Sequence, residues 1–229
     1  MVDDYGADDQ ADDGVFHVWP AFVDLLAATS LLFISLVAAF IFVSNTEIGE
    51  AITQRRQLIR ALKGVGGADS LYAIRDDAQF VRITVQADAT FPFTEWRLAS
   101  LRPAGKQALD SIGGILKRES IESLYRQVRI LGHTDQVPFV DNSSSNWELS
   151  AARAAVVARY LIDSGGLNPC KVSAAGMGPY YPLSLQDSAV RRLPLRQRMA
   201  MNRRIEIEVV PARSPGVVEG PRCFRRGDR

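Results

Sequence analysis

Two charged residues in the C-terminal part of the chain are placed where they could act together on a small ligand. Asp135 follows a short apolar segment, and Arg153 lies in an amphipathic one. A carboxylate accepts hydrogen bonds from an ammonium group, and a guanidinium can clasp a carboxylate with two parallel N–H donors. Held a few ångströms apart, the two side chains could bind a group that carries both charges on one carbon. The alternative is a structural salt bridge between them.

A third charged residue, Asp24, interrupts an apolar run from Trp19 to Val43. A carboxylate at the centre of a membrane span costs about 2.5–3.5 kcal/mol, and less near an interface. Asp24 lies five residues after Trp19 and so near the start of the run. Intramembrane carboxylates often carry protons, so Asp24 is a candidate proton carrier. The alternative is an acid whose side chain reaches the membrane surface.

The apolar run predicts a transmembrane helix over residues 18–44. At 1.5 Å per residue, about 25 residues reach roughly 37 Å, enough to cross a bilayer core. The preceding residues 1–17 are acidic and the run is long, which favours a permanent span over a cleaved signal peptide. Thr29, Ser30 and Ser35 lie deeper in the run. They could pack against a partner helix or touch an ion path, or they could bond their own backbone.

Residues 45–70 predict a linker helix. Apolar residues recur there at steps of three and four, a helical seam of about two heptads, formed with Arg55 by Ile48, Ala51, Ile52, Leu58, Ile59 and Leu62. The seam could pair with a second copy of the chain or lie on its own domain. Gly64, Gly66 and Gly67 predict its end.

Residues 71–212 predict a domain of the α+β class, an α/β sandwich of about 140 residues. Strands are expected at 80–85, 128–131, 172–175 and 204–210, and helices at 103–118 and 145–163. Asp135 then lies at a strand end and Arg153 on the second helix. The expected inward face of that helix consists of Leu149, Ala152, Val156, Tyr160 and Leu161.

Charge and composition exclude several classes of protein. The net charge is +1, yet the N-terminal tail is acidic and residues 213–229 form a basic tail. The pattern is not that of a nucleic-acid binder, and neither a catalytic triad, a phosphate loop nor a metal cluster stands out, so we expect no enzyme, cofactor or metal. Cys170 and Cys223 fit no metal motif; in an exported domain they could form a disulfide or remain two thiols.

Four motifs in the soluble part, in this order, resemble the OmpA-like peptidoglycan-binding family: Ile130–Asp135, Asn146–Ala154, Gly176–Gly178 with Pro182, and Asn202–Ile207. The resemblance covers about residues 80–210. It implies that Asp135 and Arg153 hold the ammonium and carboxylate of diaminopimelate in the peptidoglycan stem peptide, while Asn146 and Leu149 shape the pocket. His133, Thr134, Asn202 and Arg203 are expected to support the turn and the pocket loop. The loop Pro138–Ser145 departs from the family pattern.

The segment Trp19–Ala28 resembles the MotB type of stator subunit. That resemblance implies the B subunit of a rotary motor driven by protons carried on Asp24, with a homodimer of this chain inside a ring of five MotA-like multispan subunits. The acidic tail and the short linker favour a Zorya-like anti-phage B subunit or a divergent MotB-type stator over a typical flagellar stator. The alternative from another class is a passive wall tether without ion transport.

The two resemblances imply a single-pass protein of the bacterial inner membrane, with the N-terminus in the cytoplasm and the domain in the periplasm. Charge opposes this orientation, because basic residues normally lie on the cytoplasmic side. None precedes the span, whereas Arg55, Arg56, Arg60 and Lys63 follow it. We follow the domain, since its expected ligand lies outside the cytoplasm. The choice between proton and sodium stays open.

Overall fold

The computed structural model describes residues 18–63, 72–77, 79–92, 95–138 and 145–212. The two predicted tails, the glycines at 64–67, the loop 139–144 and Cys223 lie outside these residues. Internal contacts divide the chain into two units, Met1–Ile48 and Gly49–Arg229. Helix α2, Val18–Lys63, contributes to both units.

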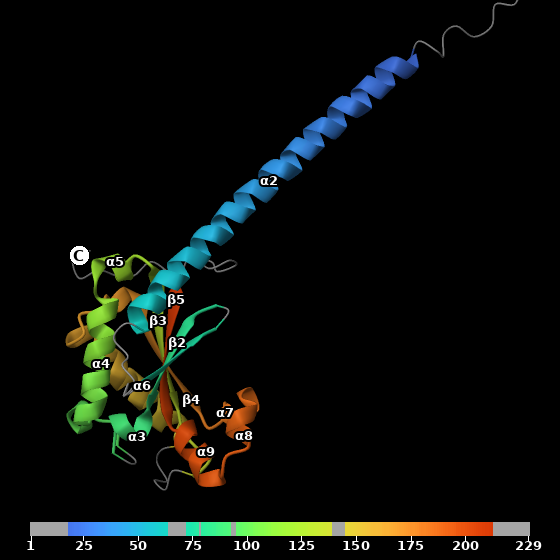
Figure 1. The fold of residues 1–229 in the computed structure, drawn as a ribbon. Helices are drawn as coiled ribbons and strands as arrows, with labels where there is room; N and C mark the ends of the chain where they lie inside the picture. Colours follow the sequence, from blue (N-terminus) through green and yellow to red (C-terminus); the bar gives the residue numbers. More distant parts are fainter. Residues whose placement is uncertain (1–17, 64–71, 78, 93–94, 139–144, 213–229) are drawn as a thin grey trace, which may run out of the picture. The chain divides into compact units, whose positions relative to one another are not determined.

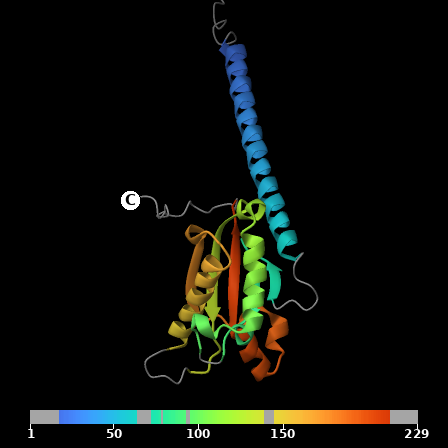
Figure 2. The same ribbon diagram turned by 90° about the vertical axis from the view of Figure 1, so that its left-hand side faces the viewer.

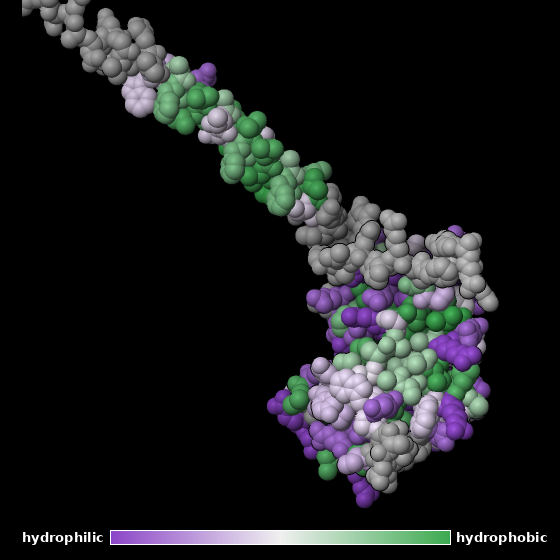
Figure 3. All heavy atoms as spheres, turned by 180° about the vertical axis from the view of Figure 1, so that it is seen from behind, coloured by the Kyte–Doolittle hydropathy of each residue, from purple (hydrophilic) through white to green (hydrophobic). Residues whose placement is uncertain are grey.

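The first unit contains the apolar segment of α2. Trp19–Ser44, with a mean hydropathy of 2.5, is long and apolar enough to cross a membrane. Its 26 residues extend about 39 Å at 1.5 Å per residue. Large apolar side chains such as Phe33 and Phe40 are exposed along it, which gives the hydrophobic surface seen in Figure 3. Among its polar residues, Thr29 and Ser35 donate to carbonyls of their own helix, 2.9 Å to Leu25 O and 2.8 Å to Leu32 O.

A five-stranded sheet forms the centre of the second unit, in the spatial order β1-β2-β5-β3-β4. The neighbours pair antiparallel except β3 and β4, which are parallel. A parallel pair needs a crossover connection, and here α6 lies within it. The strands are β1 Tyr72–Asp76, β2 Val81–Gln86, β3 Tyr125–His133, β4 Val172–Gly178 and β5 Arg204–Pro211.

Two long helices, α4 (Pro103–Leu116) and α6 (Asn146–Asp163), lie side by side over one face of the sheet (Figure 2). Apolar residues of the central strands, such as Ile83 on β2, Ile130 on β3 and Ile207 on β5, are buried beneath them. The short elements α7, α8 and α9 gather at one end of the sheet (Figure 1). The short elements are α3 Ala87–Thr90, η1 Leu98–Ser100, α5 Glu119–Glu122, η2 Pro169–Lys171, α7 Leu183–Gln186, α8 Ser188–Arg191 and α9 Leu195–Asn202.

The last turns of α2 belong to the core of this unit. Leu58 and Leu62 are fully buried in the same hydrophobic cluster as the sheet, and Ile59 packs against it. Arg55 Nε also donates to Asp76 Oδ1 on β1, at 2.6 Å. Of the two roles considered for the linker seam, its second half therefore packs on its own domain.

Two features of this unit differ from the sequence expectation. Strand β1 was not expected, because only Tyr72 of its five residues is buried and the segment shows no apolar alternation. The buried face of α6 is rotated by about one residue: Arg153, Ala154 and Val157 point inward, whereas Ala152, Val156 and Tyr160 are half-buried. Arg153 occupies an inward position that hydrophobic periodicity assigns to an apolar side chain.

Candidate functional site

Two glycines allow the start of α6 to lie directly on the ends of β3 and β4. A Cβ on Gly132 would clash with the backbone carbonyl of Ser150, and one on Gly176 would come 2.6 Å from Ala151 N. Ser150 Oγ then accepts a hydrogen bond from Gly178 N at 3.0 Å. Because the helix and the strands approach this closely, side chains from the first turns of α6 reach the end of β3.

The N-terminus of α6 is fixed by a capping box. Ser145 Oγ accepts from Trp147 N at 3.2 Å, and Ser145 N donates to Glu148 Oε2 at 2.8 Å. The next residue, Asn146, donates from Nδ2 to Val137 O at 2.7 Å and reaches Asp135 O at 3.4 Å. Asn146 therefore ties the helix start to the turn that carries Asp135.

Asp135 is buried and has an arginine partner, but that partner is Arg203. Asp135 Oδ1 accepts from Val137 N at 3.1 Å, and Oδ2 accepts from Arg203 Nη1 at 2.6 Å. Arg203 also donates to both oxygens of Asp88, from Nε at 3.0 Å and from Nη2 at 2.6 Å. The hydrogen bond to Asp88, with that to Asp135, raises the pKa of Arg203 although burial opposes it.

Arg153 lies on α6 with its guanidinium buried. Its Nε donates to Glu95 O at 2.9 Å and its Nη2 donates to Pro92 O at 3.2 Å, while the group lies 5.6 Å from the ring centre of Phe91. Burial lowers the pKa of Arg153, and Asp88 and Asp135 act in the opposite direction. No ion pair joins Arg153 directly to Asp135 in the part of the chain that the structure describes.

The site therefore contains two acids and two arginines instead of the single predicted pair. Asp88, Asp135, Arg153 and Arg203 interact electrostatically and their formal charges balance. Asp88 is half-exposed, so the group is open to solvent on that side. Such a set suits a ligand that itself carries an ammonium and a carboxylate. Leu149, predicted to shape the pocket, is buried on the same helix as Arg153.

A second charged network lies behind the site and fixes its flanking segments. Arg204 is fully buried and donates to Glu206 Oε1 at 2.7 Å, to Asn202 O at 3.3 Å and to Tyr181 O at 3.2 Å. Burial acts to raise the pKa of Glu206, but His133 and Arg204 outweigh it and lower that pKa to about 2. Burial also lowers the pKa of His133. The carbonyl of Asn202, the residue before Arg203, is thereby hydrogen-bonded to this network, and both His133 and Asn202 are buried.

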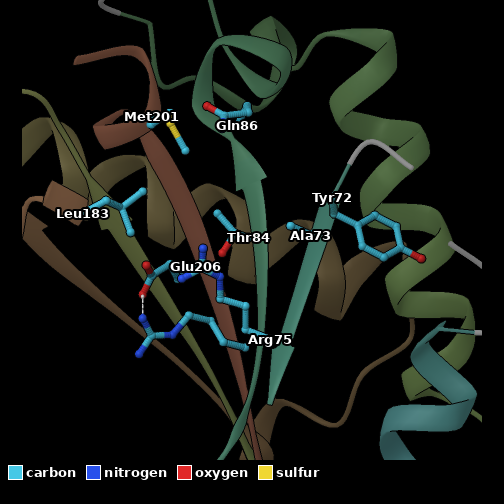
Figure 4. Close-up of a pocket in the computed structure, with 9 residues that line it drawn as sticks. Tyr72, Ala73, Arg75, Thr84, Gln86, Leu183, Met201 and Glu206 are labelled. Carbon is cyan, nitrogen blue, oxygen red and sulfur yellow. Dashed lines mark ion pairs between the residues drawn. The ribbon is translucent and has the colours of Figure 1, made fainter. Parts of the chain in front are cut away.

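A cleft of about 400 Å³ lies elsewhere in the second unit, on the sheet face that carries Arg82 and Thr84 (Figure 4). Arg82 Nη1 lies 3.5 Å from Glu206 Oε2 inside it. None of Asp88, Asp135, Arg153 and Arg203 lines this cleft, so it is distinct from the candidate site. Its walls are formed by Tyr72, Ala73, Arg75, Arg82, Thr84, Gln86, Leu183, Met201 and Glu206.

The remaining predicted residues lie apart from this site. Asp24 is part of α2 in the first unit. Cys170 follows Pro169 in η2 and is disulfide-bonded, while Cys223, its predicted partner, lies outside the described residues. Sequence reasoning missed Asp88, which belongs to no recognised motif. It identified Arg203 only as a supporting residue, although the arginine stands inside the fourth motif.

Comparison with known proteins points to the same family that the four sequence motifs resemble. Residues 95–193 match the OmpA family. The C-terminal domain is OmpA-like. Outer membrane protein A of Citrobacter freundii is 35% identical over 135 residues, 58% of this chain and 53% of that protein. The Bordetella avium protein of the same name is 30% identical over 132 residues, 58% of this chain and 59% of its own length. The chain thus spans little more than half the length of these curated relatives.

Solved structures share the fold of the OmpA-like domain. A MotB-like protein from Desulfovibrio vulgaris aligns with a TM-score of 0.58 and 24% identity, over 72% of this chain and 94% of that one. The cell wall anchor of the type VI secretion system from Pseudomonas aeruginosa aligns with a TM-score of 0.52 and 28% identity, over 67% and 96%. The predicted α+β class, with an N-terminal apolar helix, is thereby confirmed.

Proposed function

We propose that the OmpA-like domain binds peptidoglycan through the diaminopimelate of its stem peptide. The main supporting observation is the charge-balanced cluster of Asp88, Asp135, Arg153 and Arg203 at the end of β3, in which Asp135 and Arg153 are buried. Charge balance within the cluster suits a zwitterionic head group better than a simple cation or anion. The likeness to the cell wall anchor of Pseudomonas aeruginosa supports attachment to the cell wall.

In this proposal the ligand ammonium donates to Asp135, and the ligand carboxylate accepts from Arg153. Two of the five N–H groups of Arg153 donate to the carbonyls of Pro92 and Glu95, which hold the guanidinium in one orientation. Its other N–H groups supply the donors for the carboxylate. Asn146 and Leu149 hold the start of α6 in place, and the hydrogen bond from Arg203 orients the Asp135 carboxylate.

The wall site has a direct test in Asp135→Asn, which keeps the shape of the side chain and removes its charge. Truncating one partner of a buried charged hydrogen bond typically costs 2–5 kcal/mol, so we expect binding to purified peptidoglycan in a pull-down to fall at least 30-fold. Asp163→Asn, an exposed acid at the far end of α6, is the matched control and should bind normally. Unchanged binding by a folded Asp135→Asn protein would refute the assignment.

We further propose that the chain is a single-pass inner-membrane protein with a periplasmic domain, acting as the B subunit of a proton-driven rotary motor. The apolar helix with Asp24 near its start, followed by a MotB-like domain fold, supports this proposal. A homodimer would stand inside five MotA-like subunits, held to the wall by its OmpA-like domains.

A substitution of Asp24 distinguishes the motor from the passive tether. With the multispan partner co-expressed, Asp24→Asn should abolish proton flux across the membrane and leave peptidoglycan binding unchanged, because Asn cannot carry a proton. If the wild type with its partner shows no proton flux, the tether is the better description, and if Asp24→Asn retains full flux, Asp24 is not the proton carrier. Loss of phage protection in the variant would place the motor in Zorya-type defence, and loss of swimming would place it in motility.

A further inference from the structure

Two aromatic rings lie exposed at the rim of the candidate site. Trp147 is 50% exposed and Tyr180 is 67% exposed. Their ring centroids are 5.5 Å apart and the planes are inclined by 51°. Large aromatic side chains contribute most when they are covered, and exposed apolar clusters commonly mark binding surfaces. The two rings thus form an aromatic pair that is open to solvent.

The aromatic pair packs against backbone that belongs to the candidate site. Gly178, at φ +56°, lies under both rings: a Cβ there would come 3.3 Å from Tyr180 Cδ2 and 3.5 Å from Trp147 Cε3. The same glycine accepts a hydrogen bond from Thr134 N at 3.1 Å, next to Asp135. Trp147 also directly follows Asn146, whose amide reaches the Asp135 carbonyl. The rings are thus held against the turn that carries the wall-binding carboxylate.

We propose that Trp147 and Tyr180 form a sugar subsite that binds an N-acetylated amino sugar of the glycan strand. This inference rests on the proposed peptidoglycan function. A pyranose ring presents a face of C–H groups, which pack on aromatic rings through dispersion contacts. In peptidoglycan, two residues separate diaminopimelate from the sugar-linked lactyl group, so at about 3.3–3.6 Å per residue the sugar lies roughly 10 Å away. A ligand bound at Asp135 could therefore place its sugar on the adjacent rings of Trp147 and Tyr180.

The test compares three soluble probes on the detergent-solubilised full chain by calorimetry: a disaccharide-tripeptide containing diaminopimelate, the free tripeptide, and the disaccharide alone. We expect the wild type to bind the disaccharide-tripeptide roughly 5- to 10-fold more tightly than the free tripeptide, in line with the aromatic contact involved. Trp147→Ala and Tyr180→Ala should remove this preference and leave the affinity for the free tripeptide unchanged. Trp147→Phe should keep part of the preference.

Leu185→Ala is the matched control, because it removes a 73%-exposed apolar side chain on α7 and should keep the full preference. The sugar subsite is refuted if the wild type shows neither a preference for the disaccharide-tripeptide nor binding of the disaccharide, or if both alanine variants keep the wild-type behaviour. Failure of the wild type to bind the free tripeptide would instead contradict the diaminopimelate site. Sugar binding that depends on Trp147 would then still support the subsite.

Discussion

The buried pair of Arg204 and Glu206 offers the sharpest energetic test of how the candidate site is held. Glu206→Gln keeps the volume of the side chain and removes its charge, which leaves the fully buried Arg204 without its carboxylate partner. Removing one partner of a buried ion pair typically costs 3–5 kcal/mol. Set against a usual domain stability of about 5–15 kcal/mol, the variant should fold but unfold at clearly lower urea concentration.

The dependence of stability on pH gives a second value for the free energy by which the ionised Glu206 side chain stabilises the folded protein. The pKa of Glu206 is about 2 in the folded protein, against 4.5 without the surrounding structure. A group with a depressed folded pKa stabilises the protein above its unfolded pKa, and that contribution is lost as the pH falls through the folded value. The full difference is worth roughly 3 kcal/mol. It should be present at pH 6 and decline from about pH 4.5 towards pH 2.

The assay is urea unfolding of the detergent-solubilised chain, followed by fluorescence of Trp96 and Trp147 between pH 6 and pH 3. We expect the free energy of unfolding of Glu206→Gln to be about 3 kcal/mol lower than that of the wild type at pH 6. This difference should become smaller as the pH falls. Peptide binding should also weaken, because Arg204 bonds Asn202 and Tyr181 on either side of the site. A gap below about 1 kcal/mol, or one that does not change with pH, would refute the reasoning.

Two further substitutions test the packing that positions the site. Leu62→Ala should destabilise the OmpA-like domain by about 2–5 kcal/mol in urea unfolding, because the side chain is fully buried in its core; the control Ile52→Ala, at a 45%-exposed position, should change stability by less than 1 kcal/mol. Equal effects would mean that the end of α2 is not part of the domain. Gly132→Ala should abolish tripeptide binding and lower stability, since its Cβ would meet the Ser150 carbonyl. Gly114→Ala on α4, with nothing within 4 Å of the added carbon, should stabilise by up to about 1 kcal/mol.

The apolar span, the main strands and helices of the domain, and the central candidate residues could all be predicted from the sequence. These follow from local signals. A run of apolar residues, alternation in β5 and the capping residues at Ser145 are each read within a few positions of the chain. The motifs also identified Asp135 and Asn146, which the fold does bring together through a hydrogen bond.

Which charged side chains pair with one another could not be predicted from the sequence and depends on the folded domain. Arg203 pairs with Asp135, 68 positions away, and with Asp88, 115 positions away. Such contacts depend on the pairing of β5 with β2 and β3, which no local pattern encodes. The inward rotation of Arg153 and the burial of Leu62 have the same origin, because packing against distant elements decides which side of a helix is covered. The residues of the short motifs therefore form the four-residue charge cluster, together with Asp88, only in the folded domain.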